Sequence, residues 1–527
     1  MVFPYVVFTY FLRLLLAASL VISPSLKARM NLLTKLFFSL SLLFLLNYTS
    51  FAQDLSQGLI LNDLDPHPMQ PIAKPGYLDT IVDPSFGTTI RRITDAGPGN
   101  IIAPMYSTIQ AWNADESLMI VYEVGGQHRL LNGQTYTFMR TLDDVNPADV
   151  EQIFWDFEQP DVFYYLERNT YKFTSYQVST RIKTVLADLT TLPLNCTEYA
   201  MGNDVQMMSW DSRVFGFRCD DASTYYFDLD AGSFRALSVS TVGTTAAMPA
   251  PSGDRFYHRS VVYGPDGQFD FQLNENGVEH SCLGKLSDGS DAHFAISFEE
   301  GPNGGCQADV VAHDLTTGEC FPITGQVNGY EYPKSGTHIS ALAHKNENDG
   351  WLAASMIGFQ EDGQRLLDQE LIIARAVKGA PEVYRIGHHR SDENEFDYWG
   401  EPHAVISPTG TRVLFGSDWS GAEDGQSVDC YVVELPAFSV GDSTSSITEV
   451  SPIRLSPKLV DGRLYVSLPT NLSTAQLQLF DAAGRVVLSR RIRDGEGAEV
   501  RALPTGVYIV RVEEREFKGI GKIVIGR

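Results

Sequence analysis

Basic residues are scarce in this sequence. Its 40 Lys and Arg are outnumbered by 65 Asp and Glu, which gives a formal net charge of -25. Because affinity for nucleic acids comes largely from Lys and Arg at the phosphates, this balance disfavours nucleic-acid binding. An anionic substrate is not excluded, since a local basic or metal-bearing pocket can attract it against the net charge.

Common catalytic motifs are also absent. The sequence has no Gly-x-Ser-x-Gly, no P-loop, no His-Glu-x-x-His and no dinucleotide fingerprint. Its six cysteines include no Cys-x-x-Cys pair, which argues against a zinc ribbon or a thioredoxin motif. In an exported protein, Cys196 with Cys219, and Cys282 with Cys306 or Cys320, are candidate disulfides. Reduced, buried thiols are the alternative, and sequence alone does not settle the pairing.

The composition indicates a large globular β-protein. Hydrophobic residues make up 43% of the 527 residues, and 44 Gly and 23 Tyr favour many turns and aromatic-rich strands. The length predicts two to four domains, or one large β-architecture with additions.

The first 53 residues are interpreted as an N-terminal extension and a signal peptide. Met30 is the expected true start, Lys35 supplies the positive charge, and 36–46 form an apolar core too short to span a membrane comfortably. Small residues follow at Ser50 and Ala52, the two positions that a signal peptidase reads. A membrane helix over 5–22 is the alternative, although Arg13 inside it is costly in lipid.

The C-terminal part has the pattern of a small β-domain. A Ser/Thr/Gly-rich linker is expected at 437–450, and the propeller described below is expected to occupy 54–436. Short alternating segments separated by turns then predict a β-sandwich at 451–527. The predicted strands cover 464–468, 476–480, 486–490, 507–512 and 519–525.

Three runs of this part resemble the C-terminal sorting domains of type IX secretion. They are 477–486 (LQLFDAAGRV), 503–512 (LPTGVYIVRV) and 521–525 (GKIVI). The resemblance implies transport across the outer membrane by the type IX machinery, followed by release or attachment at the cell surface. An ordinary Ig-like accessory module is the alternative.

A repeated unit fills the middle of the chain: a polar turn followed by a strand rich in aromatic and β-branched residues. The seven turns lie at 112–117, 155–161, 210–213, 251–254, 286–291, 345–350 and 407–411. A period of roughly forty to sixty residues matches one four-stranded blade, so the sequence predicts an all-β, seven-bladed propeller. The segment 88–94 precedes the first repeat and is expected to close the ring as the outer strand of the last blade. The run 406–415 is similar to the repeat of TolB-like propellers.

Three histidines stand near the start of the first strand in consecutive repeats. They are His280, His338 and His403, and this first strand lines the channel of a propeller. Glu401 shares a face with His403, because side chains alternate along a strand. A divalent-metal site of His338, Glu401 and His403 is therefore predicted. Hydrogen-bonded channel residues without a metal are the alternative.

This constellation resembles the oligogalacturonate lyases, seven-bladed propellers with a divalent metal at the channel mouth. Their last blade carries His-Pro-His-Pro, where this sequence has 401–404 (EPHA), so His403 matches and Glu401 replaces a histidine. The position of a family glutamine ligand is taken by Tyr398. His338 matches a further ligand, and His280 lies near the proposed general base. The resemblance implies a Mn, Ca, Zn or Ni ion and β-elimination of uronate-containing glycans.

Two basic residues in neighbouring loops, Arg390 and Lys334, are candidates to neutralise substrate charge, together with Tyr398 as a substrate contact. Tyr106 is a candidate for stacking on sugars. Three functions remain open: a secreted polysaccharide lyase, a non-catalytic surface propeller that binds glycan or protein, and a cell-envelope module akin to the TolB propeller.

Overall fold

The chain divides into two compact units, 1–438 and 439–527, in the computed structural model. Each is described by itself. The structure describes residues 54–192, 196–202, 206–220, 223–238, 246–299, 306–330, 338–358, 362–391, 397–419, 427–438, 453–454, 457–460, 462–466, 474–480, 486–493, 496–501, 503–514 and 517–525. The proposed signal peptide and the proposed linker fall outside these residues, except for positions 437 and 438. No helix among the described residues is long and apolar enough to cross a membrane.

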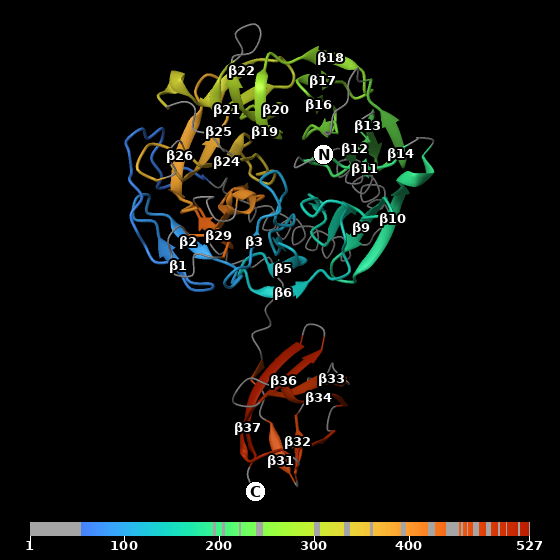
Figure 1. Ribbon diagram of the computed structural model, residues 1–527. Coiled ribbons are helices and arrows are strands. Elements are labelled where there is room, and N and C mark those ends of the chain that lie inside the picture. Colours follow the sequence, from blue (N-terminus) through green and yellow to red (C-terminus); the bar gives the residue numbers. More distant parts are fainter. Residues whose placement is uncertain are drawn as a thin grey trace, which may run out of the picture. The chain divides into compact units, whose positions relative to one another are not determined.

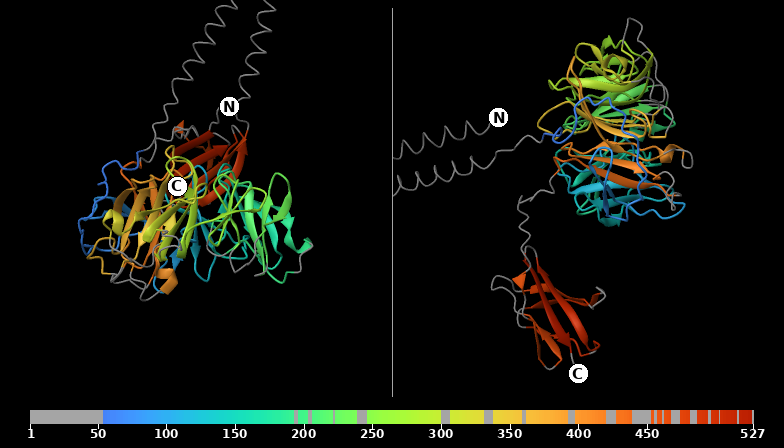
Figure 2. Two further views of the ribbon diagram at one scale, coloured as in Figure 1. Left: turned by 90° about the horizontal axis from the view of Figure 1, so that it is seen from above. Right: turned by 90° about the vertical axis from the view of Figure 1, so that its left-hand side faces the viewer.

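The described part of the first unit contains seven antiparallel sheets, arranged in a ring (Figure 1). Seen from the side, the strands run across the thickness of the ring (Figure 2). This arrangement confirms the predicted β-propeller. The only helices described are three 3₁₀ turns, η1 (Leu189–Thr191), η2 (Gln326–Asn328) and η3 (Asp397–Gly400).

Each sheet has four strands, and the last gains a fifth. The first strands are β3 (Ile102–Ala103), β7 (Phe154–Trp155), β11 (Tyr199–Ala200), β15 (Met248–Pro249), β19 (Asn276–Lys285), β23 (His338–Ser340) and β27 (Val405–Ile406). The second strands are β4 (Leu118–Glu123), β8 (Val162–Leu166), β12 (Val214–Cys219), β16 (Phe256–His258), β20 (Asp291–Glu299), β24 (Trp351–Met356) and β28 (Arg412–Ser417). The third strands are β5 (His128–Asn132), β9 (Lys172–Gln177), β13 (Ser223–Asp228), β17 (Val261–Tyr263), β21 (Ala308–Asp314), β25 (Glu370–Arg375) and β29 (Asp429–Glu434). The outer strands are β6 (Phe138–Thr141), β10 (Ile182–Asp188), β14 (Ser233–Ala236), β18 (Phe269–Gln272), β22 (Cys320–Thr324), β26 (Glu382–His388) and, in the last sheet, β2 (Thr89–Arg92) followed by β1 (Thr80–Val82).

All seven predicted repeat strands are second strands of sheets. Residues of β12, β24 and β28 are buried along their whole length, whereas the outer strands β6 and β10 are largely exposed. A second strand packs against a neighbouring sheet on both faces, so it is apolar without alternation. This burial explains why the repeat could be recognised in the sequence from its aromatic and β-branched runs.

The ring closes through its N-terminal strand. In β2, Thr89 to Arg92 pair antiparallel with Glu434 to Tyr431 of β29, as the sequence predicted for 88–94. The outer part of the last sheet therefore comes from the start of the propeller, and its inner part comes from the end.

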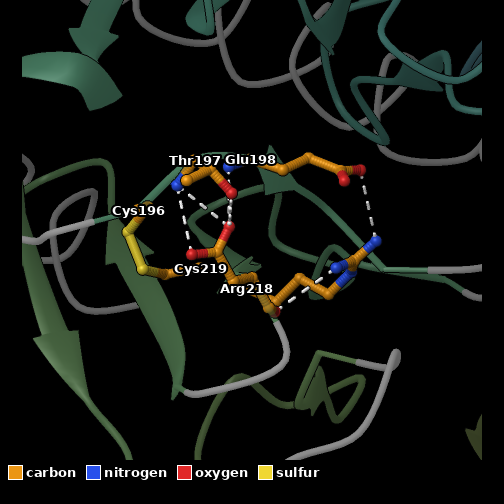
Figure 3. The surroundings of a disulfide bond; sticks show 6 residues. Cys196, Thr197, Glu198, Arg218 and Cys219 are labelled. Carbon is orange, nitrogen blue, oxygen red and sulfur yellow. Dashed lines mark hydrogen bonds and ion pairs between the residues drawn. A yellow bond between two sulfur atoms is a disulfide. The ribbon is translucent and has the colours of Figure 1, made fainter.

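Two disulfides are formed, Cys196–Cys219 and Cys306–Cys320. The first joins the segment before β11 to the end of β12, beside an ion pair of Glu198 with Arg218 (Figure 3). Cys282 is free and buried, so the expected pairing of Cys282 was wrong. Its Sγ accepts a hydrogen bond from the backbone N–H of Ala341 at 3.3 Å instead.

The second unit is a β-sandwich. One sheet has the order β30 (Ile453–Arg454), β37 (Phe517–Ile525), β36 (Gly506–Glu514), β33 (Thr474–Phe480) and β34 (Val486–Arg493). The other contains β31 (Lys458–Val460), β32 (Arg463–Tyr465) and β35 (Ala498–Glu499). Leu464 and Ala498 of the smaller sheet share one core with Leu477 and Val510 of the larger one, as the predicted sandwich requires.

Candidate functional site

The first strands of the fifth, sixth and seventh sheets lie close together and bring three imidazoles into a row. His280 lies in β19, His338 begins β23, and His403 lies just before β27. The ring centroids of His280 and His338 are 4.4 Å apart, and those of His338 and His403 are 4.3 Å apart. The structure thus brings together the three histidines that the sequence singled out.

Close backbone approach and inter-strand hydrogen bonds hold this row. A Cβ at Gly284 of β19 would meet the Cβ of Ala341 at 2.5 Å, so the glycine allows the two inner segments to approach. The hydroxyl of Ser340 accepts a hydrogen bond from the N–H of Ile406 at 3.2 Å, which ties β23 to β27. The neighbouring inner strands are therefore in contact where the histidines are carried.

Two of the three histidines have an unusual backbone. His280 has a φ of 49° and His403 a φ of 43°, both in the left-handed region that L-residues rarely adopt. In β19 the pairing with β20 shifts register between Glu279 and Cys282, so His280 sits at a bulge. Residues with such strained backbone conformations cluster at functional sites, where the strain directs a side chain toward the site.

A single carboxylate oxygen joins two of the imidazoles. Oε2 of Glu401 lies 3.2 Å from Nε2 of His338 and 3.3 Å from Nε2 of His403. Donor atoms bound tetrahedrally to one metal at about 2.0–2.1 Å lie about 3.3 Å from one another. Both of these separations match ligands on one ion, and all three donor atoms lie within 4.8 Å of one another. The donor set, two imidazoles and a carboxylate, suits zinc, manganese or nickel.

Burial of the His338–Glu401–His403 group affects both its access to solvent and its protonation. The side chain of His338 is 1% exposed and that of Glu401 is 21% exposed, so the group is closed on one side and reaches solvent at the glutamate. Neither ring nitrogen of His338 has a hydrogen-bond partner of good geometry among the described residues. Burial lowers the pKa of His338 well below its usual value, and the neighbouring His403 and His280 lower it further. The ring is thus neutral at pH 7, the form that binds a metal.

Aromatic side chains surround the group. The ring of Tyr106 lies 5.4 Å from that of His338 and 5.0 Å from that of His403. The ring of Tyr398 lies 4.8 Å from that of His403, and its hydroxyl donates a hydrogen bond to Oε1 of Glu151 at 2.6 Å. Glu151 is buried and was not foreseen, because it lies in a loop far away in the sequence and carries no motif.

Arg390 is engaged elsewhere. Its guanidinium donates to the carbonyl of Gln70 at 2.7 Å, lies 3.7 Å from the carboxylate of Asp83 and stacks over Trp419. These buried contacts give Arg390 a structural role, and its contact with substrate stays a prediction. Lys334, the other predicted basic residue, lies outside the described residues.

Comparison with known proteins identifies the C-terminal unit. Residues 457–526 match the family model of the secretion system C-terminal sorting domain, which confirms the prediction made from the three sequence runs. This domain marks proteins exported by the type IX secretion system to the cell surface or beyond.

Solved structures similar to the chain include an oligogalacturonate lyase in complex with manganese. That protein shares 16% identity and has a TM-score of 0.48, over 69% of this chain and 99% of its own. Another is oligogalacturonate lyase from Vibrio parahaemolyticus, with 15% identity and a TM-score of 0.47, over 68% and 96% of the two chains. No curated protein matches the sequence.

Proposed function

We propose that this exported propeller is a metal-dependent polysaccharide lyase that acts on uronate-containing glycans. The observation that carries the proposal is the position of Glu401 Oε2, between Nε2 of His338 and Nε2 of His403, beside a third imidazole. A carboxylate and two imidazoles converging at one partly open point form a ligand set with room for an outside group.

In this proposal His338, Glu401 and His403 hold the ion. A bound divalent cation would neutralise the carboxylate of a uronate and so acidify the proton at C5. His280 accepts that proton, because its ring lies beside the ligand His338 but outside the three-atom set. The electron pair of the C5–H bond forms the C4–C5 double bond, the C4–O bond breaks, and the departing oxygen takes a proton from solvent.

The aromatic residues have a binding role in the same proposal. Tyr106 and Tyr398 flank His403 with their rings, and sugar rings stack on such apolar faces. The hydrogen bond to Glu151 fixes the orientation of Tyr398. These aromatic residues equally support the second candidate function, a surface propeller that binds glycan without cleaving it.

The test is metal content and turnover of three purified proteins: wild type, His403→Ala and His280→Ala. Elemental mass spectrometry reports the metal, and ultraviolet absorbance of the unsaturated product reports the lyase during a screen of uronate polysaccharides. We expect His403→Ala to lose the ion at this site and the activity, and His280→Ala to lose only the activity. His67→Ala, which changes a partly exposed histidine paired with Asp63, is the matched control.

A folded wild type that carries no metal at this site would overturn the metal-dependent mechanism. A wild type that binds uronate glycans but releases no unsaturated product would favour the glycan-binding function.

A further inference from the structure

A second group of two histidines and a glutamate lies inside the fifth sheet. His293 of β20 and His313 of β21 are direct cross-strand partners, and Glu275 comes from the segment between β18 and β19. The side chains of all three are fully buried. The group is separate from the first site and takes no part in the proposed reaction.

The donor atoms of this group have the spacing found at the first site. Oε2 of Glu275 lies 3.3 Å from Nδ1 of His293 and 3.5 Å from Nδ1 of His313. These are again the separations of ligands around one tetrahedral ion, about 3.3 Å. One connecting segment and two adjacent strands thus direct three ligand-type atoms at one point.

Within the described part of the chain, the two rings have no other polar partner of good geometry. Among the described residues, no ring nitrogen of His293 or His313 makes a hydrogen bond of good geometry, and Oε2 of Glu275 makes none either. A buried polar atom without a partner destabilises the folded state, so five such atoms in one place need a compensating group. A cation satisfies the three that face one another.

The surroundings position the glutamate as a ligand. The hydroxyl of Tyr257 donates to Oε1 of Glu275 at 2.5 Å, and its ring stacks on His293 with centroids 3.9 Å apart. Metal-bound carboxylates are commonly held by such an outer hydrogen bond, which leaves the other oxygen for the ion. The neighbouring Cys306 and Cys320 are joined as a disulfide, so the available ligands are nitrogen and oxygen atoms.

We propose that Glu275, His293 and His313 form a second metal site, which holds a structural zinc ion. Two imidazoles and a carboxylate suit zinc, which binds nitrogen and oxygen ligands and has no geometric preference of its own. Full burial denies a substrate access, so the ion stabilises the fold and does not catalyse. It links β20, β21 and the segment leading into β19, the strand that carries His280.

The test separates the two sites by using His403→Ala as the background. After equilibration of the full chain with zinc and removal of loose ions, we expect two equivalents of zinc in wild type, one in His403→Ala and none in His403→Ala/His293→Gln. His403→Ala/His67→Gln is the matched control and should keep one equivalent. We also expect a chelator to lower the thermal midpoint of His403→Ala.

A His403→Ala protein that is folded and holds no zinc would overturn the second site, whatever the first site binds. A single equivalent in wild type that survives His403→Ala would support the second site and count against the first. If the His293 variant does not fold, anomalous scattering at the zinc edge from wild-type crystals decides, because a peak beside Glu275 is required. Its absence would leave a metal-free histidine–carboxylate cluster.

Discussion

The carboxylate of Asp429 lies 2.8 Å from the guanidinium of Arg92, although 337 residues separate them in the sequence. Asp429 begins β29 and Arg92 ends β2, so the pair joins the two ends of the propeller chain. Lys74 adds a second cation at 2.9 Å, and Thr94 and the backbone N–H of Ala96 donate hydrogen bonds to the other oxygen. Buried ion pairs therefore hold the ring closed together with the pairing of β2 and β29.

Asp429→Asn should lower the free energy of unfolding by about 3–5 kcal/mol, because it removes the buried negative charge that Arg92 and Lys74 share. Arg92 keeps its ion pair with Asp95, whose carboxylate is largely exposed. Urea unfolding followed by tryptophan fluorescence measures the loss. Asp270→Asn is the control, since its pair with Arg255 is half-exposed and is worth at most about 1 kcal/mol. Equal losses in the two variants would show that the closure does not depend on this charge.

Protonation of His128 should destabilise the protein in mild acid. The ring is buried against the carbonyl of Val150 at 2.6 Å, and burial lowers the pKa of His128 from about 6.5 to about 4. Since the folded-state pKa is the lower one, this contribution is fully present above pH 6.5 and falls as the pH drops towards 4, by up to about 3 kcal/mol.

Chemical unfolding of wild type and His128→Gln between pH 8 and pH 4 measures this effect. The difference between the two proteins should shrink as the pH falls, because the variant has no imidazole to protonate. Curves that stay parallel over the whole range would contradict the assignment.

Removal of the first disulfide by Cys196→Ser/Cys219→Ser should lower the free energy of unfolding by about 3 kcal/mol, as expected for a loop with a sequence separation of 23. The hydrogen bonds from the N–H groups of Thr197 and Glu198 to Asp220 remain in the variant and should preserve the local fold. Calorimetry of both proteins checks the loss. An unchanged midpoint would mean that these hydrogen bonds already constrain the loop.

Export should depend on the folded core of the sorting domain. Val510 is buried in β36, whereas Val524 in β37 is 61% exposed. Val510→Asp places a charge in the core and should block export, so that the protein stays on the periplasmic side of the outer membrane. Deletion of 451–527 should have the same effect. Val524→Asp should be exported normally. Cell fractionation and protease accessibility distinguish these outcomes, and normal export of Val510→Asp would separate recognition from folding of the domain.

Much of the fold could be predicted because it depends on patterns of residues that are close together in the sequence. The turn at 112–117 and the apolar strand after it lie side by side in the sequence, and the same holds for the other six repeats, so each second strand could be predicted without knowledge of its neighbours. The segment 88–94 was assigned to ring closure because a closed propeller needs an outer strand for its last sheet. The sorting domain was recognised from three short runs for the same reason.

The sites required more than local signals. His280, His338 and His403 could be matched by their places in the repeat, and Glu401 by its spacing from His403. That one oxygen of Glu401 lies between two imidazoles was decided by the tertiary structure. The surroundings of Arg390 also could not be predicted from the sequence: its guanidinium is buried beside Trp419 and Asp83, which lie in other segments of the chain.

By itself, then, the sequence determined the class of fold, the repeat, the closing strand and the export signal, because each depends on residues close together in the chain or on the count of repeats. Only the tertiary structure decided which thiols pair, that Cys282 stays free, and that Glu275 meets His293 and His313. These contacts depend on strand register and on the approach of one sheet to the next. A shift of one residue in register would turn the same side chains to the opposite face.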